Sequence, residues 1–196
     1  MKKLALVLTA TVALATLVGC GGGSDTQTAP ISKKTVSMLD DLMKQKNNLM
    51  QDGIVSEIGI KKSQDLSMAI NMAEQDARAK MGRAITAKVA SVTKQFNEEV
   101  NDEFLEHTSQ VNKTVSSEML RGTTVITQKY ETLENGKLQA YVLMVMDPAA
   151  FKSALDSQMQ ANENMKTRWM ASKAQEDLSK EVEAYEAYKK ENTPQM

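Results

Sequence analysis

Residues 123 to 146, with the sequence TTVITQKYETLENGKLQAYVLMVM, decide the fold. The first part, Thr123 to Tyr130, alternates β-branched and polar residues, which is typical of a half-buried strand. Asn135-Gly136 is a strong signal for a hairpin turn. The second part, Leu138 to Met146, is almost continuously apolar, which favours a strand that is covered on both faces. We therefore expect two antiparallel strands, the second of them central in its sheet.

A third strand is expected upstream of this hairpin, at Ile54 to Ile60 (IVSEIGI). The run is rich in β-branched residues and partly alternates with polar ones. Gly59 within it predicts a bulge, or a strand end where two backbones approach closely.

Between these strands the sequence predicts its clearest helix, with Asp65 or Ser63 as a cap. Its small residues would allow close approach to a sheet. A weaker pattern to Ser117 predicts that the helix continues after a kink near Asn101. Packing of this helix on the strands gives an α+β fold, in which a small three-stranded antiparallel or mixed sheet covers a long amphipathic helix. The apolar stripe of the helix comprises Leu66, Ile70, Ala73, Ala77, Met81, Ala84, Ile85, Val89, Val92, Phe96 and Val100.

Further helices are expected on both sides of this domain, which we place at residues 54 to 158. Residues 35 to 53 predict a short amphipathic helix that ends at Gly53. Residues 159 to 196 predict a C-terminal helical extension, because apolar residues recur without Gly or Pro until Pro194. One continuous helix from 149 to 190 would be roughly 63 Å long. It must therefore project from the domain or turn back on it.

The N-terminus predicts a lipoprotein signal peptide at residues 1 to 19. Two lysines precede about 15 apolar residues, which span roughly 22 Å as a helix, against about 30 Å for a bilayer core. Leu17-Val18-Gly19-Cys20 resembles the bacterial lipobox. We expect Cys20 to carry a diacylglyceryl group and an N-acyl chain such as palmitate, and residues 20 to 34 to form a flexible tether. The alternative is an ordinary cleavable signal that contains a cysteine.

The composition excludes several classes of protein. The 196 residues include 24 Lys and Arg and 25 Asp and Glu, for a formal charge of -1, and no long basic run indicates nucleic-acid binding. Loss of Lys2 and Lys3 with the signal changes the side-chain balance to -3. A hydrophobic content of 41% is too high for a disordered chain.

We identify no catalytic, cofactor-binding or metal-binding residue. His107 has no second His as a co-ligand, so we expect it to pack in or near the core. The acidic groups Glu98-Glu99 and Glu181-Glu183-Glu186 favour a solvated helix surface, with paired acids in a cleft as the alternative. Most of the 14 methionines are expected to fill the core, including Met68, Met72 and Met170. A copper site at Met144 and Met146 is the less favoured interpretation.

The order of strand, long Ala-rich helix, hairpin and helix behind a lipobox resembles the bacterial family of twenty-kilodalton membrane-associated lipoproteins (the Lpp-twenty family). The similarity covers about residues 54 to 158 and rests on Glu57 to Ile60, Ala73 to Val89 and Thr124 to Met146. The family tends to have two glycines around its first strand, where this chain has Gly59 alone. The segment from about Asn162 lies outside the similarity. The resemblance implies no catalytic residues, and relatives include lipoproteins of flagellar outer-membrane structures.

We therefore expect a non-enzymatic lipoprotein of the bacterial envelope, anchored through Cys20 to the outer membrane on its periplasmic or surface face. Gly21 supports the outer membrane, because inner-membrane lipoproteins commonly carry Asp there. The protein would assemble with itself or with an envelope structure, a flagellum-related one included. The alternative is a surface-displayed ligand-binding or adhesive lipoprotein. An enzyme would need Ser or carboxylate chemistry that no motif indicates, and no small-molecule substrate is identified.

Overall fold

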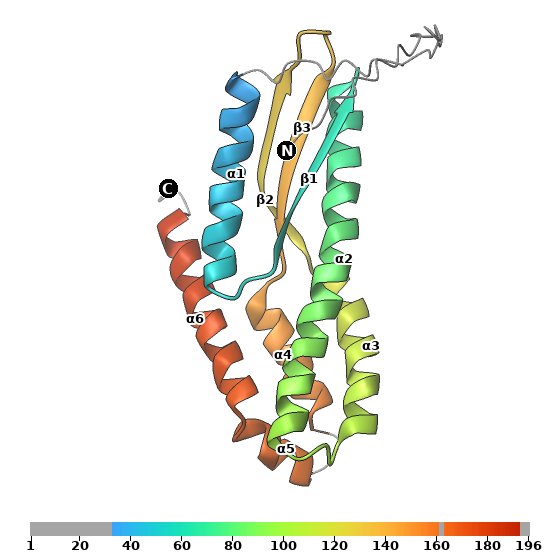
Figure 1. Cartoon of the computed structure of the whole chain (residues 1–196), viewed down its shortest axis with the longest axis vertical. Coiled ribbons are helices and arrows are strands. Elements are labelled where there is room, and N and C mark those ends of the chain that lie inside the picture. The colour runs from blue at the N-terminus through green and yellow to red at the C-terminus, as the bar shows by residue number, and fades with distance from the viewer. Residues whose placement is uncertain (1–32, 161–162, 193–196) are drawn as a thin grey trace, which may run out of the picture. The chain divides into compact units, whose positions relative to one another are not determined.

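The computed structural model describes residues 33 to 160 and 163 to 192, and these form an α+β fold as expected. A three-stranded sheet packs on a long helix, and further helices precede and follow it (Figure 1). The elements in chain order are α1 (Lys33–Gln51), β1 (Ser56–Ser63), α2 (Leu66–Glu99), α3 (Leu105–Arg121), β2 (Thr124–Thr132), β3 (Leu138–Val145), α4 (Pro148–Gln158), α5 (Glu163–Met170) and α6 (Lys173–Asn192).

The sheet has the order β1-β3-β2, and both pairs of neighbouring strands are antiparallel. The predicted hairpin is confirmed, as is the central place of β3. The register between β1 and β3 is continuous from Ser56 opposite Val145 to Ser63 opposite Leu138, so the bulge predicted at Gly59 is wrong. The irregularity of the sheet lies instead in β2, between Val125 and Thr127.

The two faces of β3 belong to two different parts of the core. Ala140, Val142 and Met144 face α2 and join the larger cluster, which also includes residues of α3 to α6. The alternate residues Tyr141, Leu143 and Val145 join a smaller cluster with α1 and the C-terminal half of α6. Because successive side chains of a strand point to opposite faces, the apolar run of β3 supplies both clusters.

Close approach of backbones at Gly59 is confirmed. A Cβ atom added there would lie 1.9 Å from the Ala73 carbonyl oxygen and 2.6 Å from the Ala77 backbone nitrogen. Ala69, Ala73 and Ala77 are fully buried on this side of α2. The small side chains of the helix and the missing one of Gly59 therefore let β1 lie directly on α2.

A helix after Asn101 is confirmed as α3, but the kink expected near Asn101 is instead a reversal of the chain. Helix α2 ends at Glu99, and Asn101 and Asp102 adopt left-handed backbone angles with φ of 53° and 60°. Asn and Asp tolerate this conformation better than most residues. The chain then reverses, and α3 packs back along α2 (Figure 1). Val111 and Val115 of α3 are buried in the same cluster as Val89 of α2. The helical spacing of apolar residues therefore continues into α3, although the chain has reversed its direction.

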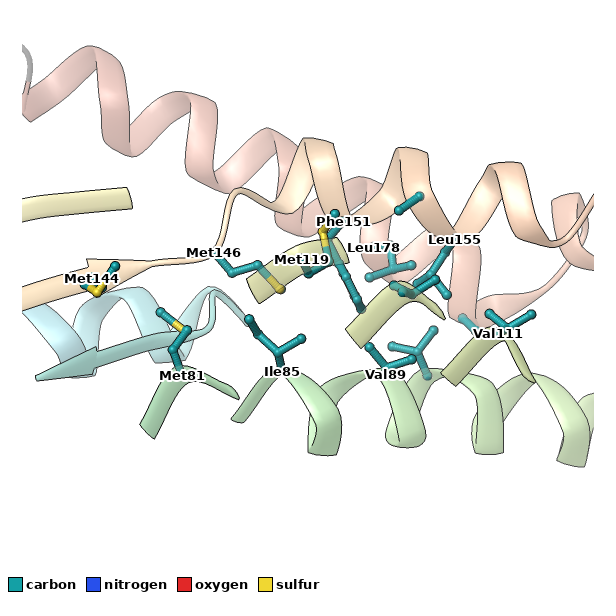
Figure 2. Packing of buried hydrophobic residues seen from close by; sticks show 14 of the residues in the cluster. Met81, Ile85, Val89, Val111, Met119, Met144, Met146, Phe151, Leu155 and Leu178 are labelled. Carbon is teal, nitrogen blue, oxygen red and sulfur yellow. The ribbon is translucent and has the colours of Figure 1, made fainter. Parts of the chain in front are cut away.

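The C-terminal segment turns back on the domain, which is the second of the two expected arrangements. It consists of α4, α5 and α6, and Met165, Trp169 and Leu178 from the last two are buried in the larger cluster. Figure 2 shows Leu178 beside Phe151 and Leu155 of α4, near Val89 and Val111 of α2 and α3. The helices after residue 158 thus contribute to the domain core.

Candidate functional site

Cys20, the predicted lipidation residue, lies outside the described residues, as does the predicted signal peptide at residues 1 to 19. The first helix, α1, starts at Lys33, two residues before the helix expected from residue 35. None of the helices in the described part of the chain is long and apolar enough to cross a membrane.

His107 is half-buried on α3, and its Nε2 atom lies 3.1 Å from the carbonyl oxygen of Gln158 in α4. This contact links two helices and agrees with a packing role. Within residues 33 to 160 and 163 to 192, no three His, Cys, Asp or Glu side chains come together as a possible metal site.

The acidic groups differ in their surroundings. Glu98 is exposed, and Glu99 accepts hydrogen bonds from the backbone nitrogens of Lys173 and Ala174 at 2.8 and 3.3 Å, which caps the start of α6. Glu181 is half-buried, which corrects the expectation of a solvated position. It pairs with Lys88 of α2, and burial raises the pKa of its carboxyl although Lys88 acts in the opposite direction.

The methionines divide between core and surface. Met81, Met144, Met146, Met159 and Met165 are buried as expected. The expected core positions of Met68, Met72 and Met170 are wrong, because their exposed fractions are 54%, 37% and 58%. For Met68 and Met72 the reason lies in α2, which buries its small residues Ala69 and Ala73 against the sheet. The methionines one residue earlier in the chain then fall on its flank.

The outer edge of β1 is closed by two side chains of α2. The backbone N–H of Ile60 donates to Asp76 Oδ2 at 3.2 Å, and Lys80 Nζ donates to the carbonyl oxygen of Ile58 at 2.7 Å. Asp76 also pairs with Lys80 at 2.8 Å and with Lys61 at 3.4 Å. The hydrogen bond from Lys80, with further help from Ile60 and Lys61, lowers the pKa of the Asp76 carboxyl. Sequence reasoning missed this arrangement, for which the signal was an Asp-Lys pair at i,i+4 in a helix beside a strand.

Exposed methionines occur on both helices whose side chains contact this edge. On α1, Met43 and Met50 lie one turn before and after Lys46, which pairs with Glu57 of β1 at 2.6 Å. On α2, Met72 lies one turn before Asp76, and Met68 lies one turn earlier still. Met43 and Met50 have exposed fractions of 46% and 60%. We call the outer edge of β1 together with Met43, Met50, Met68 and Met72 the β1 edge surface.

A buried polar cluster lies between β2 and the central strand β3. The Tyr141 hydroxyl donates to Glu131 Oε1 at 2.5 Å and accepts a hydrogen bond from Gln139 Nε2. All three side chains are buried, and Glu131 and Gln139 are opposite one another in the register of β2 and β3. The cluster joins the two strands of the hairpin near its turn.

Comparison with family models, with curated proteins and with solved structures finds nothing that matches this chain.

Proposed function

We propose that the chain is a non-enzymatic lipoprotein of the bacterial envelope, anchored at the outer membrane through Cys20, which assembles with itself or with an envelope structure. The observation that carries the assembly is the β1 edge surface. Four exposed methionines lie on the two helices whose side chains contact this edge strand, and groups of large exposed apolar side chains are typical of interaction sites. Methionine is suited to such a surface because its side chain adapts to different partners.

The lipobox at Leu17 to Cys20 supports the anchor. Twelve residues, 21 to 32, separate Cys20 from the start of α1, and they reach at most about 40 Å when fully extended. A folded body on this tether stays near the membrane. The resemblance to the Lpp-twenty family over residues 54 to 158 supports the same class of protein and an outer-membrane location.

The second candidate is a surface-displayed ligand-binding or adhesive lipoprotein. The feature that favours it is a hollow of about 650 Å³ between α1 and α6, whose lining includes Asp41, Lys44 and Tyr188. Its lining carries both signs of charge, so it does not select one class of ligand.

Membrane fractionation of cells tests the anchor. We expect the parent chain in the membrane fraction and the Cys20→Ser variant outside it, because a stable anchor needs the acyl chains. Retention of the variant in the membrane would contradict the anchor.

Chemical cross-linking of the lipidated chain in whole cells tests the assembly. We expect cross-linked species that contain two or more copies or an envelope protein. A chain that remains monomeric in cells and binds a small molecule in the hollow between α1 and α6 would favour the second candidate.

A further inference from the structure

We propose that the four exposed methionines of the β1 edge surface, Met43, Met50, Met68 and Met72, are sites of oxidation to methionine sulfoxide, and that this modification prevents assembly. The reagents are two-electron oxidants of the hypohalous acid class. The effect on assembly rests on the proposed function, whereas the sites of oxidation do not depend on it.

The methionines of the chain fall into two groups by exposure. The four on the β1 edge surface have exposed fractions between 37% and 60%. A second group is at most 5% exposed and belongs to the larger core cluster. Because an oxidant in solution reaches a sulfur atom only where the side chain is exposed, the folded chain presents the first group and shields the second. The shielded methionines are Met81, Met119, Met144, Met146, Met159 and Met165.

Few other side chains of the described surface compete for such an oxidant. The single Cys of the sequence, Cys20, is a thioether under the proposed function and not a free thiol. The single Trp, Trp169, is 1% exposed. Tyr130 is 53% exposed, but hypohalous acids react with a phenol more slowly than with a thioether. The exposed methionine sulfur atoms are therefore the first targets.

Each reaction adds one oxygen atom to sulfur, and hypochlorous acid shows how the atoms balance. The lone pair of the sulfur attacks chlorine, the bond between chlorine and oxygen breaks, and water then replaces chlorine on the sulfur. The sulfur loses two electrons to the oxidant, which leaves as chloride, and one proton is released. An apolar side chain thus becomes a polar one, a change that disrupts Met-rich interfaces.

The folded body tolerates these sulfoxides. On α1, Lys46 lies one turn from both Met43 and Met50, and its ammonium has three N–H donors, only one of which the pair with Glu57 requires. A sulfoxide oxygen on either methionine thus has a donor within reach. Because the exposed side chains of α1 and α2 meet solvent, the added oxygen does not enter the core. Oxidation therefore changes the surface and leaves the fold intact.

Met170 separates reactivity from the effect on assembly. It lies on α5, is 58% exposed, and is not part of the β1 edge surface. It should be oxidised as readily as the other exposed methionines, but its oxidation should leave assembly unchanged. Substitutions of Met170 are therefore the matched controls for substitutions on the β1 edge surface.

The first experiment maps the sites. The mature chain, residues 20 to 196 with Cys20→Ser, is treated in dilute solution with hypochlorous acid and analysed by mass spectrometry of its peptides. We expect the exposed methionines to be oxidised at least about tenfold faster than the buried ones. Treatment in concentrated urea should remove this difference, because unfolding exposes every sulfur atom. Equal rates in the folded chain would overturn the proposed sites.

The second experiment measures assembly by cross-linking the lipidated chain in whole cells. Glutamine carries a polar carbonyl and imitates the sulfoxide, so replacement of the four methionines of the β1 edge surface by Gln should lower the yield of cross-linked species several-fold. Replacement of the same four by Leu should keep the yield, also in cells that synthesise the chain in the presence of hypochlorous acid. Met170→Gln should keep the yield as well, and all variants should retain the circular dichroism of the parent.

The outcomes distinguish this inference from the function on which it rests. If the cross-linked assemblies persist unchanged in the fourfold Gln variant, oxidation does not control assembly, while the proposed function stands. A fourfold Gln variant that loses the parent's circular dichroism would show that the fold does not tolerate the modification. If the parent chain forms no assembly in cells, the proposed function fails, and the control by oxidation fails with it.

Discussion

Gly59 is the residue at which β1 crosses α2, and the crossing leaves no space for a side chain. Overpacking a core usually costs about 1–3 kcal/mol. We expect Gly59→Ala to destabilise the protein by the upper end of this range or more. The added carbon would meet backbone atoms of Ala73 and Ala77, which cannot move aside as a side chain can. Urea unfolding measures the change.

Gly82 offers a matched control for this substitution. It lies within α2, and an added Cβ there would meet only the side chain of Leu120 at an ordinary contact distance of 3.7 Å. Gly82→Ala should therefore stabilise the protein by up to about 1 kcal/mol through helix propensity. Equal changes in the free energy of unfolding for Gly59→Ala and Gly82→Ala would contradict the close contact between Gly59 and the backbone of α2.

Glu181 gives the protein a pH dependence of defined sign. Burial raises the pKa of its carboxyl above the ordinary 4.5, so the folded chain binds this proton more tightly than the unfolded chain. The stability that this tighter proton binding gives the folded state is fully present below about pH 4.5, and it is lost as the pH rises through the pKa of the folded chain. Glutamine cannot ionise, so we expect the free energy of unfolding of Glu181→Gln to lack this decrease with rising pH. The measurement is the free energy of unfolding of parent and variant between pH 4 and 7.

Asp76 has the opposite sign and serves as the comparison. Its carboxyl has a pKa below the ordinary 3.8, so its contribution is present above about pH 4 and is lost as acid protonates the folded form. Asp76→Asn should therefore lower the free energy of unfolding around neutral pH and reduce its further fall in acid. A Glu181→Gln variant whose stability follows the same pH curve as the parent would contradict the assignment.

At the scale of elements, α5 contributes two buried side chains to the core, Met165 and the larger Trp169. Trp169 is fully buried, its ring meets the edge of Phe96 with centroids 5.5 Å apart, and its Nε1 donates to Asp156 at 2.7 Å. We expect Trp169→Ala to cost about 3–5 kcal/mol. Trp169→Phe keeps most of the aromatic packing and loses the hydrogen bond, so it should cost clearly less. Urea unfolding compares the two, and an equal cost would mean that packing on Phe96 contributes little.

The elements themselves were largely predictable, whereas their directions were not. The period of two in Thr123 to Tyr130 and the turn at Asn135-Gly136 determine the hairpin locally. The reversal after Glu99 depends on left-handed backbone at Asn101 and Asp102, and the apolar period continues through it. Periodicity reports which face of a helix is buried, but it carries no information on whether the next helix continues or turns back.

The β1 edge surface was missed for a related reason. The sequence placed Ala73 on the buried stripe, and hydrophobicity alone assigned Met68 and Met72 to the core as well. The structure buries the alanines because Gly59 brings β1 too close to α2 for any longer side chain. The burial of a residue in α2 is thus decided by its partner strand.

At the scale of the whole molecule, the C-terminal helices are part of the domain. Deletion of residues 162 to 196 removes Met165, Trp169 and Leu178 from the larger cluster and uncovers the α1 side of the sheet at Tyr185. We expect the truncated chain to lose cooperative unfolding. Thermal melting followed by circular dichroism measures this, and a truncated chain that melts cooperatively near the parent temperature would contradict the shared core.

Under the proposed function, the folded body stays close to a membrane and presents the β1 edge surface for assembly. The anchor at Cys20 is the central claim, and the mass of the mature protein isolated from bacterial membranes tests it most directly. We predict a chain that begins at Cys20 and carries the mass of a diacylglyceryl group and an N-acyl chain on that residue. A chain that begins elsewhere, or an unmodified Cys20, would contradict the account.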